Sequence, residues 1–480
     1  MSGSSIALIG FAVMLAAMAL RMPIGLSMLV VGGVGYSLLN GLGPFLAYMK
    51  TNTYHQFANY TLSVIPLFIL MGALAERAGI ATALFKAAER GFGRMRGGLG
   101  MAVIGACTAF GAICGSSVAT TATFGRAALP ELTRFGYDRG FSTGTIAIGG
   151  TLGILIPPSV ILVVYAITTE QNIAKLFQAA LIPGLMAAVS YCIVIAIRVR
   201  QNPALAPDQE AAVVVVAPRP RWLYGVSLLL LAAVLAGFAS GSIETTPAVL
   251  GGLLALLIAF ADVSILPALA IALIVVGGIY GGVFTPTEGA AVGAIAMLAA
   301  GILTRSLTFE DVREALRQTA ITSGMIFIIL LGAEVFGAFL ALSRVPMLAA
   351  EWVAGLGLSP YLVLVGMLAF YILLGAVMDE LAMILLTLPV FFPVIQGLEF
   401  GMFADDVAIW FGILVLIVVG IGLTAPPIGL NVFVIHQIAK TVPLVEIYRG
   451  VLPFIAADIV RLGIVVTFPA TALWLVRILN

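Results

Sequence analysis

Charged side chains are scarce in this chain. Lysine and arginine together number 23, aspartate and glutamate 22, which is 9% of 480 residues. Soluble domains carry about 25% charged residues, so a soluble globular protein is excluded. The formal net charge of +1 also leaves no basic excess for a phosphate-binding surface, and nucleic acid is therefore not an expected partner.

Histidine and cysteine are few as well, with two and three residues. His55 and His436 are far apart in sequence, and Cys107, Cys114 and Cys192 lie in apolar runs without the spacing of metal ligands. An intramembrane enzyme should gather such groups around a cleft, and the scattered charges argue against one. The chain has no ATP-binding motif. We therefore expect neither an enzyme nor a protein with a bound cofactor.

Apolar residues dominate the composition: 62% of the chain is hydrophobic and the mean hydropathy is +1.17. Runs of about 20 apolar residues predict an all-α, polytopic membrane protein of about 12 transmembrane helices. The predicted spans are residues 5–20, 24–43, 62–76, 141–168, 176–197, 222–240, 246–261, 265–284, 287–303, 320–341, 407–435 and 451–476. Residues 98–130 and 361–394 are interpreted as two re-entrant helical hairpins.

The basic residues orient these spans. If the first helix begins outside, most Lys and Arg residues fall at the cytoplasmic ends, as the positive-inside rule requires. Basic clusters flank residues 98–130 on both sides, so the first hairpin should enter from the cytoplasm. The second hairpin is followed by Glu399, Asp405 and Asp406 and should enter from outside.

Two apolar stretches are interrupted by a double proline, within residues 149–159 and 420–431. Proline stops a helix and leaves backbone groups unpaired, which persists in a membrane where the unwound backbone lines a cavity or binds an ion. Gly115 and Gly375 mark the expected hairpin centres. The order helix, hairpin, broken helix, closing helix occurs twice, and four crossings between the units make the second repeat inverted.

The predicted organisation is therefore N-terminal scaffold helices at 1–60, a first repeat at 61–200, a central part at 201–318 and a second repeat at 319–480. The central part contains a polar cytoplasmic loop and two apparently extra spans. Residues 80–96 and 345–356 are expected to be surface helices that lie along the membrane.

Hydroxyl residues gather at the first hairpin tip: Ser116, Ser117 and Thr120. They offer oxygen ligands to a hard cation, or they allow close helix packing. At the second tip, Asp379 is a carboxylate inside a span, where insertion costs about 2.5 to 3.5 kcal/mol. It is predicted to coordinate a cation or carry a proton, and an N-cap is the alternative. For Glu380, a solvent-facing position is the alternative to a site role.

Two other motifs are interpreted as structural. Thr285 and Glu288 have the spacing of a capping box around Pro286. Asp458 and Arg461 are intramembrane charges three residues apart, which places them on one helix face as a pair. A relay role for that pair is the alternative.

The chain resembles the large membrane subunit of tripartite ATP-independent periplasmic (TRAP) transporters. The resemblance covers most of the chain and rests on five segments that match the family pattern in order: residues 115–120, 149–159, 181–184, 281–288 and 424–431. It implies sodium-driven import of an organic acid (carboxylate) anion by an elevator movement in the bacterial inner membrane, where the distribution of basic residues predicts a periplasmic N-terminus. It also implies two partners, a periplasmic substrate-binding protein and a small membrane subunit of four helices.

The resemblance also assigns site residues. One sodium ion would lie between Ser116 and Ser117 and the segment Gly153 to Pro157, and the substrate would meet Ser117, Thr120 and Asn431. A second sodium ion would lie between Asp379 and the segment that contains Gly422, Thr424 and Pro426. Residues 222–262 depart from the family's usual length.

Three alternatives stay open at this point. The first is an ion-coupled carboxylate symporter or antiporter that works without a periplasmic receptor. The second is an intramembrane enzyme, and the third is a passive channel lined by the broken helices.

Overall fold

The computed structural model describes residues 2–93, 95–207 and 266–479, and all regular structure in these ranges is helical. The predicted all-α, multi-pass fold is thereby confirmed. The two apparently extra spans at 222–240 and 246–261, and the polar loop from residue 208 onward, lie outside the described residues.

The helices follow the predicted order closely. Their bounds are α1 (Gly3–Ala19), α2 (Ile24–Asn40), α3 (Leu42–Phe57), α4 (Val64–Arg77), α5 (Ile80–Phe92), α6 (Gly98–Cys114), α7 (Ser117–Arg134), α8 (Arg139–Leu155), α9 (Val160–Thr168), α10 (Ile173–Gln201), α13 (Leu266–Tyr280), α14 (Pro286–Leu303), α15 (Phe309–Ser343), α16 (Val345–Gly355), α17 (Pro360–Gly375), α18 (Glu380–Gln396), α19 (Ala404–Gly422), α20 (Leu430–Ile438), α21 (Leu444–Thr467) and α22 (Ala470–Leu479).

Within the described ranges, six helices are long and apolar enough to cross a membrane, or seven if the bent pair α8 and α9 counts as one span. Three expected spans, α1, α2 and α13, are shorter, with 17, 17 and 15 residues. The last expected span, 451–476, is wrong as a single helix. It divides into α21 and α22 at Pro469, because proline cannot donate the next helical hydrogen bond.

Helix α3 is not among the expected spans, since Lys50, Asn52 and His55 interrupt its apolar residues. The remaining order repeats as predicted. Two helices, a hairpin, a broken helix and a closing helix run from α4 to α10, and the same series runs from α15 to α21. The breaks fall at Pro157–Pro158 and Pro426–Pro427, and both of these peptide bonds are cis.

One detail of the second hairpin differs from expectation. Gly375 is not its centre but the last residue of α17, and the turn comprises residues 376–379. Gly115, by contrast, lies in the first turn with a φ of 65°. The second turn is longer because α18 begins only after Asp379, which caps it.

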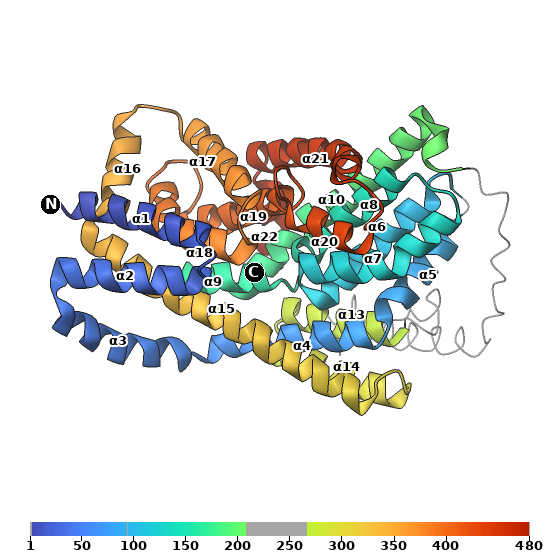
Figure 1. Cartoon of the computed structure of the whole chain (residues 1–480), viewed down its shortest axis with the longest axis horizontal. Coiled ribbons are helices and arrows are strands. Elements are labelled where there is room, and N and C mark those ends of the chain that lie inside the picture. Colours follow the sequence, from blue (N-terminus) through green and yellow to red (C-terminus); the bar gives the residue numbers. More distant parts are fainter. Residues whose placement is uncertain (1, 94, 208–265, 480) are drawn as a thin grey trace.

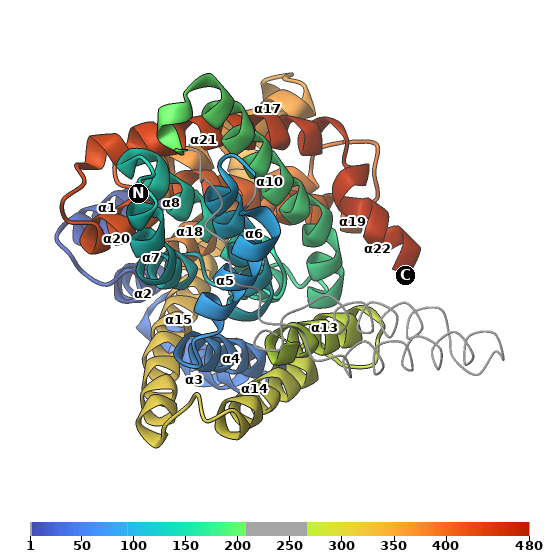
Figure 2. The same ribbon diagram turned by 90° about the vertical axis from the view of Figure 1, so that its right-hand side faces the viewer.

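The helices form two groups, which Figures 1 and 2 show on opposite sides of the molecule. Helices α3, α4, α13, α14 and α15 lie on one side, and the hairpins, the broken helices and α21 lie on the other. The 35-residue helix α15 packs along α2 and α4. The broken helices α8 and α19 are buried along almost their whole length, as helices that are apolar all round should be. Their broken ends therefore lie in the interior of the protein.

Candidate functional site

The first hairpin tip lies directly against the first broken helix. The carbonyl oxygen of Ser116 accepts the Thr120 hydroxyl at 2.7 Å. A Cβ atom on Gly153 would lie 2.6 Å from that same carbonyl and also against the Thr120 oxygen. Because Gly153 has no side chain, two oxygens of the tip reach the broken helix. Pro157, at the break, is buried.

The second hairpin makes the corresponding contact with the second broken helix. A Cβ atom on Gly422 would lie 2.7 Å from the Cα atom of Gly375. The carbonyl of Ala376 accepts the backbone N–H groups of Ile428 and Gly429 at 3.2 and 3.3 Å. Each hairpin is therefore held to the break of its own repeat by backbone contact.

Two further residues of the second break were expected at a cation site. Thr424 is fully buried, and its hydroxyl donates to the carbonyl of Ile421 at 3.1 Å. Pro426 is exposed, unlike Pro157. The two breaks are thus alike in their backbone contacts and different in their exposure.

The carboxylate of Asp379 caps α18. Its Oδ1 atom accepts the N–H groups of Leu381 and Ala382 at 3.0 and 3.4 Å. The N-cap alternative is therefore confirmed. Both bonds stay within α18, whereas the hairpin's contact with Gly422 runs through Gly375.

Glu380 does not face solvent. It is 9% exposed, and its Oε2 atom has no hydrogen-bond partner among the described residues. The solvent-facing alternative for this residue is wrong, because the first turn of α18 points it into the protein.

The expected substrate residues meet between the repeats. The Asn431 amide nitrogen of α20 donates to the Ser117 hydroxyl of α7 at 2.7 Å and to the carbonyl of Ala147 at 3.1 Å. Ser117, Thr120 and Asn431 are all fully buried. Thr120 bonds to Ser116 instead. The structure thus brings Ser117 and Asn431 together in a closed arrangement.

A cavity of about 1180 Å³ separates the two groups of helices. Ser116, Asp379 and Glu380 line it on one side, and Gly25 of α2 and Met325 of α15 line it on the other. Both hairpin tips therefore face the same space.

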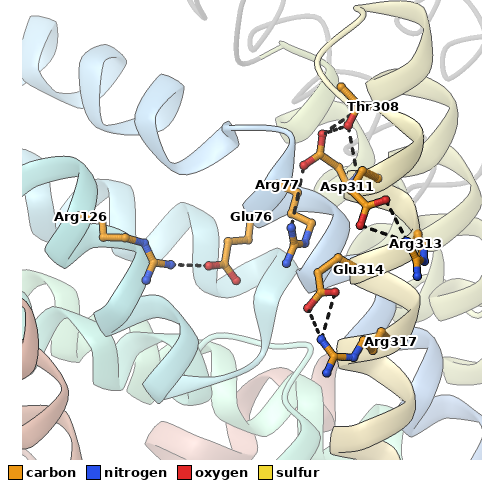
Figure 3. A network of polar contacts seen from close by, with 9 residues as sticks. Glu76, Arg77, Arg126, Thr308, Asp311, Arg313, Glu314 and Arg317 are labelled. Carbon is orange, nitrogen blue, oxygen red and sulfur yellow. Dashed lines mark hydrogen bonds and ion pairs between the residues drawn. The ribbon is translucent and has the colours of Figure 1, made fainter.

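Sequence reasoning missed an ion pair that bridges this cavity. Arg126 of α7 lies 2.6 Å from Glu76 of α4, as Figure 3 shows. Glu76 is followed by Arg77, which lies 3.9 Å from Asp311 of α15. The available signal was the position of Glu76 in the predicted span 62–76 and of Arg126 in the predicted hairpin 98–130, because charges within a membrane segment are candidates for a function.

Several buried hydroxyls, among them those of Thr121 and Ser159, have no hydrogen-bond partner in the part of the chain that the structure describes. Buried polar groups are normally paired, so these oxygens are further candidate ligands beside the first break. The sequence signal was their position within or next to the predicted hairpin and broken helix.

The two motifs interpreted as structural are confirmed. Glu288 accepts the Thr285 N–H at 2.8 Å, and the Thr285 hydroxyl accepts the Glu288 N–H at 3.3 Å. Arg461 and Asp458 form an ion pair of 2.8 Å.

Paired hairpins facing helices that break in mid-span define the class of secondary membrane transporters. Comparisons with known proteins agree with this class. Residues 11–471 match the family model described as "Tripartite ATP-independent periplasmic transporter, DctM component". The chain belongs to this family, and a transporter rather than an enzyme is confirmed.

Individual relatives extend the match. The C4-dicarboxylate TRAP transporter large permease protein DctM of Pseudomonas aeruginosa is 34% identical over 421 residues, 86% of each chain. The isethionate TRAP transporter permease protein DctMQ of Oleidesulfovibrio alaskensis is 27% identical, over 88% of this chain and 59% of that longer protein. The crystal structure of the Alcanivorax borkumensis YdaH transporter shares the fold, with a TM-score of 0.58 and 15% identity over 89% of each chain.

Proposed function

We propose that this large TRAP permease imports an organic acid anion across the bacterial inner membrane, driven by sodium. The observation that carries the proposal is the paired contact of each hairpin with a glycine of a broken helix, Gly153 in one repeat and Gly422 in the other. Backbone carbonyls and hydroxyls gather at these contacts, and oxygen atoms are the ligands of hard cations. Relatives named for a C4-dicarboxylate and for isethionate handle small organic anions.

In this scheme the first sodium ion is held by Ser116, Ser117, Gly153 and Pro157. The second is held by Asp379 together with the segment of Gly422, Thr424 and Pro426. The substrate carboxylate replaces the hydrogen bond between Ser117 and Asn431, with Thr120 beside it. Each sodium charge that moves inward gains about 2.3 kcal/mol per 100 mV of membrane potential, so two ions offset the charge of an anion.

The movement is of the elevator type. The hairpins, broken helices and α21 shift as one body against the scaffold of α2, α4 and α15, across the cavity that lies between them. With the N-terminus in the periplasm, the cavity opens to the cytoplasm, since Arg126 and Glu76 lie at its cytoplasmic end.

Two partners complete the transporter: a periplasmic substrate-binding protein and a four-helix membrane subunit. The family's description as tripartite supports this composition. The name DctMQ of the longer relative supports a membrane subunit that accompanies the large one.

The test is uptake of a radiolabelled C4-dicarboxylate under an inward sodium gradient into proteoliposomes that contain this chain and its small membrane subunit, with the substrate-binding protein added. Ser117→Ala and Asp379→Ala should each lower uptake at least tenfold. Asp379→Asn keeps a good N-cap and loses the charge, so it should unfold at the parent temperature and still lose uptake. Normal uptake by all three variants would remove the site assignment. Uptake by this chain without any binding protein would favour the receptor-independent symporter or antiporter instead.

A further inference from the structure

A chain of four polar side chains runs through the most deeply buried part of the protein. Tyr191 of α10 donates its hydroxyl to Asp458 of α21 at 2.8 Å, and Arg461 lies 2.8 Å from the same carboxylate. The Thr151 hydroxyl of α8 lies 3.3 Å from the Tyr191 oxygen. None of the four residues is more than 2% exposed.

These four polar side chains join elements of both repeats. Tyr191 belongs to the closing helix of the first repeat, and Asp458 belongs to that of the second. Arg461 adds another link, because its Nη1 atom donates to the carbonyl of Pro183 in α10 at 3.2 Å. Helices α8, α10 and α21 pack against one another, and Figure 2 shows them together.

Stability alone does not account for this arrangement. Replacing a buried ion pair with well-packed apolar residues is often neutral or stabilising, since both charges lose their hydration. The ion pair instead determines the direction of the hydrogen bond that Tyr191 donates. Tyr191 has one hydroxyl hydrogen, which it gives to Asp458. The Thr151 hydroxyl donates its own hydrogen to the carbonyl of Ile148 at 2.7 Å, and the Tyr191 oxygen, at 3.3 Å, is the second and more distant acceptor of that hydrogen.

Thr151 lies where the two broken helices cross. A Cβ atom on Gly420 of α19 would lie 3.6 Å from the Thr151 Cβ atom. Gly153 follows two residues later on α8, and Thr424 of the second break donates to the Gly420 carbonyl at 3.3 Å. The four polar side chains therefore end, at Thr151, beside the segments of α8 and α19 that lead into the two breaks.

We propose that Tyr191, Asp458 and Arg461 are positioning residues that fix the crossing of α8 and α19 through Thr151, and so set the affinity for the coupling cation. This inference rests on the sodium coupling proposed above. None of the three touches the ion; they hold the backbone segments that do.

Sodium binding to the purified protein tests the inference without a known substrate. A cation at concentration c that binds only the folded protein stabilises it by RT ln(1 + c/Kd), so the unfolding temperature begins to rise once the cation concentration exceeds Kd. The unfolding temperature is measured against NaCl, with choline chloride keeping the ionic strength constant. The apparent Kd for sodium is fitted to this rise and is called the sodium midpoint. For Tyr191→Phe, the sodium midpoint should increase about 3- to 10-fold, equivalent to the loss of about one net hydrogen bond.

Tyr280→Phe is the matched control. The Tyr280 hydroxyl also donates to α10, to the Phe177 carbonyl at 2.8 Å, but it does not reach Thr151. Removal of this hydroxyl should leave the sodium midpoint within about twofold of the parent, because its hydrogen bond is not part of the polar network of Thr151, Tyr191, Asp458 and Arg461. A purely structural role for Tyr191 would lower the unfolding temperature without moving that midpoint.

A second pair of variants acts at the other end of the chain. Thr151→Val keeps the volume and removes the hydroxyl, so it should raise the sodium midpoint as Tyr191→Phe does. Thr151→Ser keeps the hydroxyl and should restore the parent value. Midpoints that equal the parent in both Tyr191→Phe and Thr151→Val would overturn the inference. A parent protein that sodium does not stabilise more than choline would overturn the sodium coupling itself, and the inference with it.

Discussion

At the residue scale, glycine decides how closely each hairpin approaches its broken helix. Gly153 and Gly422 are the points of contact. A Cβ atom on Gly422 would meet only backbone atoms of the hairpin, and one on Gly153 would meet the Thr120 hydroxyl oxygen and, at 2.6 Å, the backbone carbonyl oxygen of Ser116. A backbone atom cannot turn aside as a flexible side chain can. Even one added methyl group must therefore push the tip and the break apart.

Gly153→Ala should for this reason weaken sodium binding. Overpacking of this kind costs about 1 to 3 kcal/mol, so we expect the half-saturating sodium concentration for uptake to rise about 5- to 100-fold. Gly324→Ala on α15 is the control, since an added Cβ there meets nothing within 4 Å. The same sodium dependence in both variants would show that the contact at Gly153 plays no part in cation binding.

The residue scale also shows the limit of reading a sequence. The sequence predicted that Asp379 could serve as a cap and that Asp458 would pair with Arg461, because both depend on spacing within one helix. It did not predict the burial of Glu380 or the contact of Ser117 with Asn431 as a direct hydrogen bond. Burial and contacts between distant residues depend on packing that no local pattern records.

At the element scale, the ion pair of Glu76 and Arg126 connects a scaffold helix, α4, to the hairpin helix α7, and both residues line the cavity. An elevator shift of the hairpin by more than a few ångströms must break this contact. The pair should therefore favour the arrangement described here over the opposite one.

Charge reversal tests this role. Glu76→Arg and Arg126→Glu each place like charges together, and partly exposed pairs are worth about 0 to 1 kcal/mol, so uptake should fall up to about fivefold. The double reversal recreates the pair and should return uptake to within about twofold of the parent. Rates in the double variant as low as in the single ones would mean that the two side chains act independently. Arg313→Glu, at a pair confined to α15, is the control.

Elements with a strong chemical signal were predicted well, and others were not. The double prolines located both broken helices, and apolar length located both hairpins. Helix α3 was missed because Lys50 and His55 hide its helical character, and the division between α21 and α22 was missed although Pro469 marks it. Hydropathy averages over a window, so it overlooks a polar helix and a single breaker inside an apolar run.

At the scale of the whole molecule, the cavity, proposed above to open to the cytoplasm, allows a test of the orientation of the protein in the membrane. Ala122 lines the cavity on α7, whereas Ala128 on the same helix is fully buried. These two positions allow the orientation to be measured with a cysteine reagent.

In a background without Cys107, Cys114 and Cys192, Ala122→Cys should react with a membrane-impermeant thiol reagent in inside-out vesicles. The reaction should be at least about tenfold faster than in right-side-out vesicles, since a charged reagent cannot cross the hydrocarbon core. Ala128→Cys should react in neither. Faster labelling in right-side-out vesicles would reverse the assigned orientation.

The length of α15 has one more consequence. At 1.5 Å per residue, its 35 residues extend for about 52 Å, whereas the hydrocarbon core of a bilayer is about 30 Å thick. Its first turns carry Glu310, Arg313, Glu314 and Arg317, which form two exposed ion pairs, Arg313 with Glu310 and Arg317 with Glu314. The helix is therefore long enough to cross the bilayer and to extend beyond it. In a thinner or thicker bilayer we expect the protein to change its tilt rather than its depth in the membrane.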